Sequence, residues 1–173
     1  MAARRETGQD RLFVAVVGSG EADPELDVLA EEVGRGLAEG GAVVVCGGLG
    51  GVMAAACRGA AAADGLTIGL LPGDDPRAAN PWVLAPVATG LGELRNGLVV
   101  RSSDAVVAVG GGYGTLSEVA LALKLGRPVV GLRTFAVSRP DGTPDGGVTP
   151  VDGSAAAVSL ALALGAANRV TRK

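Results

Sequence analysis

The sequence predicts an α/β fold, in which helices cover both faces of a Rossmann-like, doubly wound and mostly parallel sheet. First, short apolar runs alternate with segments of helical character along the chain, which is the pattern of a parallel sheet. Second, these runs are apolar at successive positions, as expected of strands that are buried on both faces. Third, aromatic residues make up 2% of the chain, so Ala, Val, Leu and Gly must form the core.

The 173 residues fit one domain, 1–173, in which 1–10 and 167–173 are expected to be flexible ends. We expect strands over six apolar runs: 12–17, 42–46, 66–71, 82–88, 105–109 and 129–132. Helices are expected to follow most of them, over 24–39, 52–63, 90–103, 116–125 and 154–164. Asp23 and Pro24 are a suitable N-cap and first residue for the first helix. The remaining long segments are expected to be loops: a proline-rich loop over 72–81, suited to line or cover a site, and a surface loop over 133–152.

Composition and charge exclude several classes of function. The net charge is −3 and no basic run is interleaved with aromatic residues, so we expect no binding to nucleic acid. No apolar stretch of about 18 residues is evident, and the polar start of the chain lacks the apolar core of a signal peptide, so a cytoplasmic protein without membrane segments is expected. Histidine is absent, which excludes Ser-His, Cys-His and His-metal mechanisms. Cys46 and Cys57 lack metal-ligand spacing, so we expect no metal site and interpret both as core residues in a reducing compartment.

The segment around which the chain is organised is a glycine loop at 110–115, between an apolar strand and a helix that carries Glu118. Glycines allow a ligand to approach the backbone closely, and the N-terminus of the following helix favours an anion such as phosphate. Thr115 adds a hydroxyl group, and Glu118 is expected in the first helical turn, near a ribose or other polar group. The alternative interpretation is a tight turn followed by a solvated glutamate.

Arg95 interrupts the apolar pattern of the segment 90–103. It lies at the edge of a stripe formed by Leu91, Leu94, Leu98 and Val99. An arginine in this position either extends to water or meets a carboxylate or phosphate.

Three nucleotide and hydrolase signatures are absent. The first loop (18–20) lacks the third glycine of the dinucleotide fingerprint, and Cys46-Gly47 occupies the place of its acidic residue. The sequence contains neither a P-loop nor a G-x-S-x-G elbow. A second loop of strand–glycine–helix design follows the strand at 42–46, so up to three loops are expected at the carboxyl edge of the sheet.

The segment Gly111-Gly112-Tyr113-Gly114-Thr115-Leu116-Ser117-Glu118 resembles the PGGxGTxxE motif of the superfamily that contains the lonely-guy phosphoribohydrolases and the molybdenum cofactor carrier proteins. Members have often been called lysine decarboxylases. Gly47-Gly48 with Gly51-Val52-Met53 is similar to the earlier GGxxGLM segment of that superfamily, and Arg95 falls at the place of its catalytic arginine. The resemblance covers residues 12–132.

The resemblance implies cleavage of the N-glycosidic bond of a nucleoside 5′-monophosphate, without a cofactor, by a homodimer. It assigns Arg95 and Glu118 as the catalytic pair, because a carboxylate stabilises the positive charge that develops on the sugar ring. The phosphate would be bound by Gly111, Gly112, Gly114 and Thr115. The other expected ligand-binding residues are Gly47, Gly48 and Met53, together with Ser19 and Gly20, for which a simple turn is the alternative.

Two departures from the motif favour a second function. Gly110 replaces the leading proline, and Asn96 replaces the lysine that usually follows the arginine, as in members closer to the cofactor carriers. The alternative is therefore a non-enzymatic carrier of the molybdenum cofactor or another phosphorylated, pterin-like ligand. Lysine decarboxylation is excluded, because it needs a lysine Schiff base and Lys124 and Lys173 are poorly placed for one.

Overall fold

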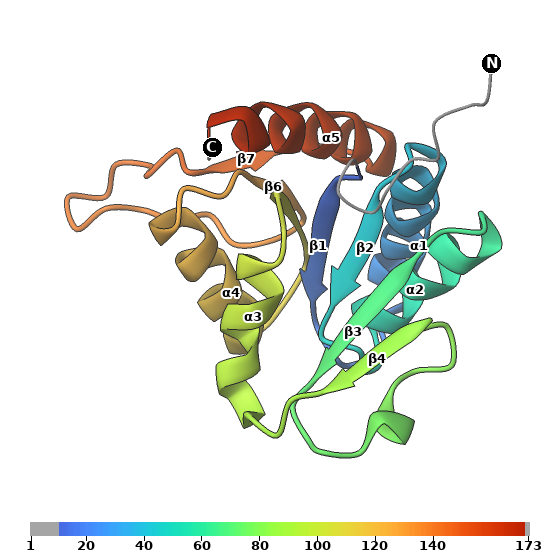
Figure 1. The fold of residues 1–173 in the computed structure, drawn as a ribbon. Coiled ribbons are helices and arrows are strands. Elements are labelled where there is room, and N and C mark those ends of the chain that lie inside the picture. Colours follow the sequence, from blue (N-terminus) through green and yellow to red (C-terminus); the bar gives the residue numbers. More distant parts are fainter. Residues whose placement is uncertain (1–10, 172–173) are drawn as a thin grey trace.

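A computed structural model describes residues 11–171, in which seven parallel strands form one sheet in the order β4-β3-β2-β1-β5-β6-β7 (Figure 1). The strands are β1 (Phe13–Gly18), β2 (Val43–Cys46), β3 (Thr67–Leu71), β4 (Ala85–Ala88), β5 (Ala105–Val109), β6 (Val129–Leu132) and β7 (Val148–Pro150). Every strand pairing in this sheet is parallel. The predicted fold class is confirmed.

The order of the strands reverses at β1, which pairs with β2 on one side and β5 on the other. Val14 is opposite Val44 of β2 and Ala105 of β5. In such a sheet, ligands bind beyond the carboxyl ends of the strands at the reversal point. The loops that follow β1, β2 and β5 leave from this edge, and they are the three glycine-containing loops of the sequence.

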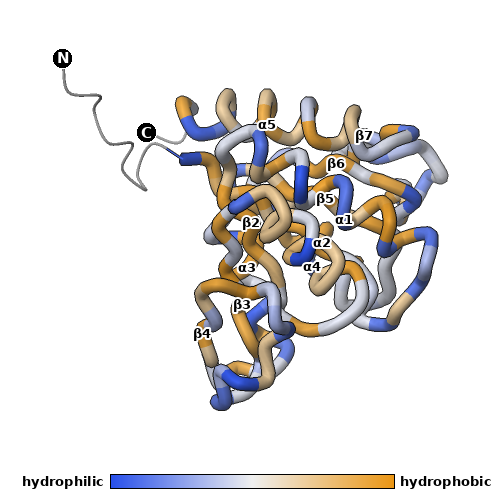
Figure 2. Tube along the Cα trace, turned by 90° about the vertical axis from the view of Figure 1, so that its right-hand side faces the viewer, coloured by the Kyte–Doolittle hydropathy of each residue, from blue (hydrophilic) through white to orange (hydrophobic). Residues whose placement is uncertain are grey.

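Helices cover both faces of the sheet. One face carries α1 (Pro24–Glu39), α2 (Val52–Ala62) and α5 (Ser154–Thr171), and the other carries α3 (Asn96–Arg101) and α4 (Tyr113–Lys124) (Figure 1). In Figure 2 the strands are mostly orange, whereas the loops and outer helical turns include many blue residues, so the apolar residues lie between these layers.

The contact between α1 and α2 depends on glycine. A Cβ atom at Gly34 would lie 1.9 Å from the carbonyl oxygen of Ala56, and one at Gly59 would lie 1.9 Å from that of Glu31. The two helix backbones therefore touch directly, which keeps α2 and the loop preceding it close to the sheet. As predicted, Asp23 caps α1: its side chain accepts hydrogen bonds from the backbone amides of Glu25 and Leu26.

Three elements differ from the sequence-based expectation. The segment 133–152 contains the edge strand β7, which is only three residues long and ends in proline, so its apolar signal is weak. The helix expected over 90–103 is a 3₁₀ turn, Gly92–Arg95, followed by the short α3. The last helix continues past the expected end at 164 to Thr171, which includes most of the segment expected to be flexible. Residues 1–10, the other expected flexible end, lie outside the described residues, as do 172–173.

Helix α5 also has an unexpectedly high hydropathy. Within residues 11–171 it is the helix long and apolar enough to meet the composition of a membrane span, with a mean hydropathy of 1.2 over 18 residues. Here it lies on the sheet through Ala157, Ala161 and Gly165. Near its end, the side chains of Asn168 and Arg169 donate hydrogen bonds to backbone carbonyls directly before β5 and just before β1.

Candidate functional site

Arg95 and Glu118 lie together at the carboxyl edge of the sheet. Arg95 ends the 3₁₀ turn and Glu118 lies in the second turn of α4, one turn later than predicted because the helix already begins at Tyr113. The Nη1 atom of Arg95 is 3.7 Å from Oε1 of Glu118, and both side chains are more than nine-tenths buried. Of the two interpretations of Arg95, extension to water is therefore wrong and the meeting with a carboxylate is correct.

The exposure of the neighbouring leucines shows why the apolar pattern of a helix predicted the wrong orientation for these side chains. Leu94, expected on the inner stripe with Leu91 and Leu98, is 79% exposed, whereas Arg95 is 7% exposed. The 3₁₀ turn has three residues per turn instead of 3.6, which shifts the face that each residue presents. As a result, the charged residue turns inward and the leucines turn outward.

The guanidinium group of Arg95 is incompletely paired. Its Nε atom is buried and has no hydrogen-bond partner, and the 3.7 Å contact with Glu118 is an ion pair beyond hydrogen-bond distance. A buried polar atom without a hydrogen-bond partner is costly. A ligand with an anionic or acceptor group would supply a hydrogen-bond partner for the guanidinium group.

Gly47 directly follows β2 and lies against the guanidinium group of Arg95. A Cβ atom at this position would lie 2.3 Å from Nη1 and 2.6 Å from Cζ of Arg95. Any side chain at position 47 would therefore displace Arg95. The predicted ligand residue Gly47 has a visible structural role, which is to make room for the arginine.

Glu118 is an unusual carboxyl group, because burial raises its pKa to about 7. The positive charge of Arg95 lowers this pKa and the negative charge of Glu93 raises it, but both effects are smaller than that of burial. Near neutral pH the group exists in both protonation states. It can therefore accept or donate a proton, as a general acid or base must.

The glycine loop after β5 has a backbone that only glycine adopts readily. Gly110 has φ +55° and Gly111 has φ +122°. Proline is restricted to φ near −65°, so the glycine at position 110, where the related motif has proline, matches the observed conformation. The carbonyl of Gly110 accepts a hydrogen bond of 2.6 Å from the Thr134 hydroxyl, which fixes the loop to the segment after β6.

The N-terminus of α4 is open to a ligand. Its N-cap is Gly112, which provides no side-chain cap, and a Cβ atom at Gly112 or Gly114 would meet nothing within 4 Å. Thr115 lies in the first turn and is buried beside Gly111. Uncapped backbone amides at a helix N-terminus attract anions, so the predicted phosphate-binding residues are in a suitable arrangement.

Ser19, Gly20 and Met53 form a second group, in which the first and second loops meet. The Ser19 hydroxyl accepts a hydrogen bond from the amide of Glu21, and its carbonyl accepts one from the amide of Val52. A Cβ atom at Gly20 would lie 3.7 Å from Cε of the buried Met53. These contacts fit the turn interpretation of Ser19 and Gly20, and they do not join the two residues to Arg95.

Two further polar contacts around the site were missed by sequence reasoning. The side chain of Asn80 donates hydrogen bonds to the carbonyls of Gly48 and Leu49, which ties the proline-rich loop to the second glycine loop. The side chain of Asn96 donates a hydrogen bond to the Ser117 hydroxyl, which joins α3 to α4. Asn80 is a polar residue directly before Pro81 in a predicted loop, and this is the signal that could have identified it.

The two cysteines lie directly behind the site. Their Sγ atoms are 3.4 Å apart, both side chains are buried, and the hydrogen bond to Cys46 raises the pKa of the Cys57 thiol. Within residues 11–171, no group of three or more Cys, Asp or Glu side chains has the arrangement of a metal site.

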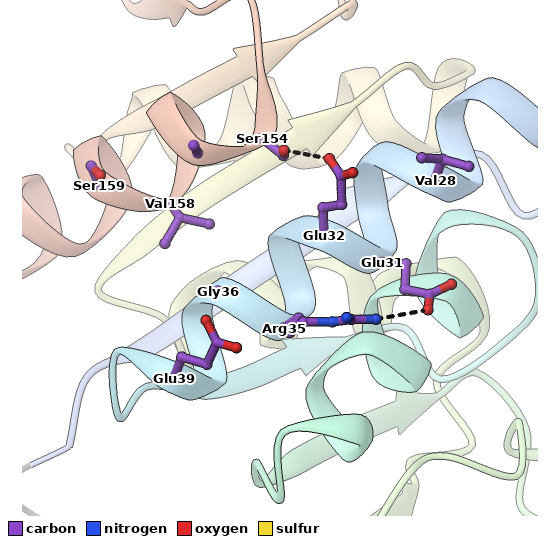
Figure 3. Close-up of a pocket in the computed structure, with 10 residues that line it drawn as sticks. Val28, Glu31, Glu32, Arg35, Gly36, Glu39, Ser154, Val158 and Ser159 are labelled. Carbon is purple, nitrogen blue, oxygen red and sulfur yellow. Dashed lines mark hydrogen bonds and ion pairs between the residues drawn. The ribbon is translucent and has the colours of Figure 1, made fainter.

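A large groove is found elsewhere on the molecule. It has a volume of 740 Å³ and lies between α1 and α5, where Arg35 contacts Glu31 and the Ser154 hydroxyl donates to Glu32 (Figure 3). None of the predicted site residues lines it. Its size alone does not make it the candidate site, because its charged groups are partly exposed and Arg35 is already paired with Glu31.

Comparisons with known proteins show similarity in sequence and in fold. A 120-residue segment, 69% of this chain and 79% of the relative, is 45% identical to an uncharacterized protein of Archaeoglobus fulgidus. The molybdenum cofactor binding protein of Rippkaea orientalis has a similar structure, with a TM-score of 0.80 and 35% identity over 89% of this chain and 97% of that one. The molybdenum cofactor carrier protein of Chlamydomonas reinhardtii gives a TM-score of 0.78 and 37% identity over 91% and 99%.

The resemblance inferred from the glycine motifs is confirmed by these similarities. The family model described as the SLOG cluster4 family matches residues 11–150, which include all three glycine loops, Arg95 and Glu118. The chain therefore belongs to the SLOG cluster4 family.

Proposed function

We propose that this protein binds a small phosphorylated ligand on the glycine loop between β5 and α4, next to Arg95 and Glu118. The observation that carries the proposal is the buried guanidinium of Arg95, whose Nε atom has no partner although Glu118 lies beside it. The uncapped amides of α4 would bind the phosphate, and Arg95 would contact the part of the ligand that lies beyond it.

The first candidate reaction is hydrolysis of a nucleoside 5′-monophosphate. In this reaction the bond between C1′ of the ribose and the base nitrogen breaks, and a water molecule adds to C1′. The carboxylate of Glu118 would take the proton of this water and stabilise the positive charge on the ring. The departing base receives a proton, so that free base and ribose 5-phosphate are formed. A pKa of about 7 suits such a proton transfer at neutral pH.

The second candidate function is transport of a phosphorylated pterin, the molybdenum cofactor in particular. It is supported by the similarity to the binding protein of Rippkaea orientalis and the carrier protein of Chlamydomonas reinhardtii. Asn96 also supports it, because this residue bonds to Ser117 where a hydrolase of the superfamily would have a lysine. In this case the phosphate site is the same and no bond is broken.

One experiment separates the two candidates. The protein is incubated with AMP and other nucleoside monophosphates, and free base is measured by chromatography for the wild type, Glu118→Gln and the surface control Glu39→Gln. Release that is lost only in Glu118→Gln supports hydrolysis. Binding of AMP, or of a phosphorylated pterin, without release supports the carrier. Absence of binding to every one of these ligands would contradict the proposal as a whole.

We further propose that two copies of the chain associate. Leu91, Leu94 and Leu98, in and around the 3₁₀ turn and α3, are exposed, as are Leu84 and Val87 in and next to the edge strand β4. Exposed apolar patches are typical of protein–protein contacts. A second copy would cover the leucines next to Arg95 and thereby exclude water from the site.

A further inference from the structure

A cavity lies next to the glycine loop, and Arg95 does not line it. The segment between β6 and β7 encloses a volume of 560 Å³. A neighbouring hollow of 370 Å³ is lined by Leu26, Gly110 and Gly111 and shares three lining residues with the cavity: Arg133, Thr134 and Phe135. The two spaces therefore meet at these three residues, directly beside the proposed phosphate site.

The walls of the cavity suit an uncharged planar group. Most of its lining is apolar, with one aromatic ring: Phe135, Ala136, Val137, Pro144, Val148, Pro150 and Val151. The charged residues of the lining are Arg133 and Asp152. A cavity of this size, apolar with few polar groups, is typical of a site for a small organic molecule.

The segment that forms the cavity has its own internal bonds. Ser138 and Pro144 form an antiparallel bridge, and the amide of Asp145 donates a hydrogen bond of 2.8 Å to the carbonyl of Val137. Arg139 and Asp145 form an ion pair across the same hairpin. These bonds hold the backbone of the segment that forms this wall of the cavity.

Arg133 lines both the cavity and the neighbouring hollow, and its backbone has an uncommon conformation. Its φ is +50°, in the left-handed region that residues other than glycine seldom adopt, and its guanidinium is paired with Glu25. Such backbone conformations occur preferentially at ligand sites. The next residue, Thr134, is the one that binds the carbonyl of Gly110. The phosphate site and the cavity are thus joined by two consecutive residues.

We infer that the ligand extends beyond its phosphate into this cavity, so that it carries a second planar ring system. Its chemical class is a pyrophosphate-linked molecule with a ring group at each end. One end lies near Arg95 and Glu118, the phosphates lie on the glycine loop beside Arg133, and the second ring packs against Phe135. This inference rests on the proposed phosphate site, and it adds the part of the ligand that a nucleoside monophosphate lacks.

Three probes of increasing length test the inference by isothermal titration calorimetry: AMP, ADP and P¹,P²-diadenosine 5′-diphosphate. ADP controls for the second phosphate, so the last comparison isolates the second adenosine. The wild type is expected to bind the diadenosine compound about tenfold more tightly than ADP, which is the gain expected for stacking one base on an aromatic ring. Equal affinity for the two compounds would overturn the inference, whereas no binding of any probe would overturn the phosphate site as well.

Two variants test whether the gain in affinity for the diadenosine compound arises in the cavity. Ala136→Trp fills the cavity and is expected to bind AMP normally and to lose the gain for the diadenosine compound. Phe135→Ala removes the aromatic wall and is also expected to lose this gain. Ala163→Trp, at an exposed alanine of α5, is the matched control and is expected to keep the gain. A gain that persists in both cavity variants would place the second ring elsewhere and contradict the inference.

Discussion

Gly47 is in close contact with the guanidinium group of Arg95: a Cβ atom on Gly47 would lie 2.3 Å from the Nη1 atom of Arg95. Gly47 follows β2 and Arg95 ends the 3₁₀ turn that follows β4, and Arg95 keeps its place only because position 47 has no side chain. The ion pair between Arg95 and Glu118 therefore depends on a residue that carries no functional group.

The first prediction is that Gly47→Ala displaces Arg95 and abolishes binding of AMP. Forcing a methyl group into this contact is expected to reduce the free energy of unfolding by about 1–3 kcal/mol. Titration calorimetry measures the binding and urea denaturation measures the stability. Gly73→Ala is the control, because a Cβ atom there would meet nothing within 4 Å. Normal binding by Gly47→Ala would contradict the role assigned to this glycine.

The second prediction concerns pH. The pKa of Glu118 is raised from 4.5 to about 7, so the folded state binds a proton that the unfolded state has already lost between these values. The stabilisation is fully present below pH 4.5 and is lost as the pH rises through 7, and it amounts to about 3 kcal/mol. Glu118→Gln cannot lose this proton. The stability of the wild type relative to Glu118→Gln is therefore expected to fall between pH 4.5 and 8.

Urea denaturation of both proteins at several pH values checks this expectation, with Glu39→Gln as the control for loss of a carboxylate on the surface. A constant difference between wild type and Glu118→Gln across the range would mean that the pKa of Glu118 is the same in the folded and unfolded states and is not raised by burial.

The third prediction is that Gly110→Pro is strongly destabilising. Proline cannot adopt the φ of +55° found at this position, so the substitution must rebuild the loop and break the contact with Thr134. We expect a loss of about 3 kcal/mol or more and a lower Tm. Gly112→Ala, at a position with φ −115° and open space around it, is expected to leave the Tm unchanged. A tolerated proline would show that the loop also accepts the conformation of the related motif.

The fourth prediction concerns the exposed leucines. Leu94→Glu places a charge in the centre of the proposed contact between two copies and is expected to yield a monomer. Size-exclusion chromatography with light scattering measures the mass. Val170→Glu, a similar change at a 75% exposed residue of α5, is expected to leave the mass unchanged. If the wild type itself has the mass of one chain, the proposed association is wrong.

Most of the fold could be predicted because its strands are continuous apolar runs that are separated by glycine and proline. The run 105–109 is an example, since every residue of β5 is buried and its bounds match the prediction. β7 was missed because an edge strand of three residues has no such run. Local pattern and local structure agree wherever a segment is buried on both faces.

The candidate site was harder to predict, because its key property arises between segments that are distant in sequence. Arg95 and Glu118 could be singled out from motif order, but the burial of Arg95 depends on the missing side chain of Gly47. The raised pKa of Glu118 likewise results from packing around α4. The cavity beside Phe135 was not predicted, because residues 133–152 contain no periodic pattern.

The pairing of β1 with β5 has a consequence for how this protein folds. These central strands are separated by about half of the chain, and contacts so distant in sequence form slowly because a long loop must close first. Gly47 and Arg95 precede β5 in the chain, whereas the glycine loop at 110–115 and Glu118 follow it. A nascent chain that has assembled only its first four strands therefore has no place for a ligand. A ligand that binds at this site therefore stabilises the complete sheet and neither half by itself.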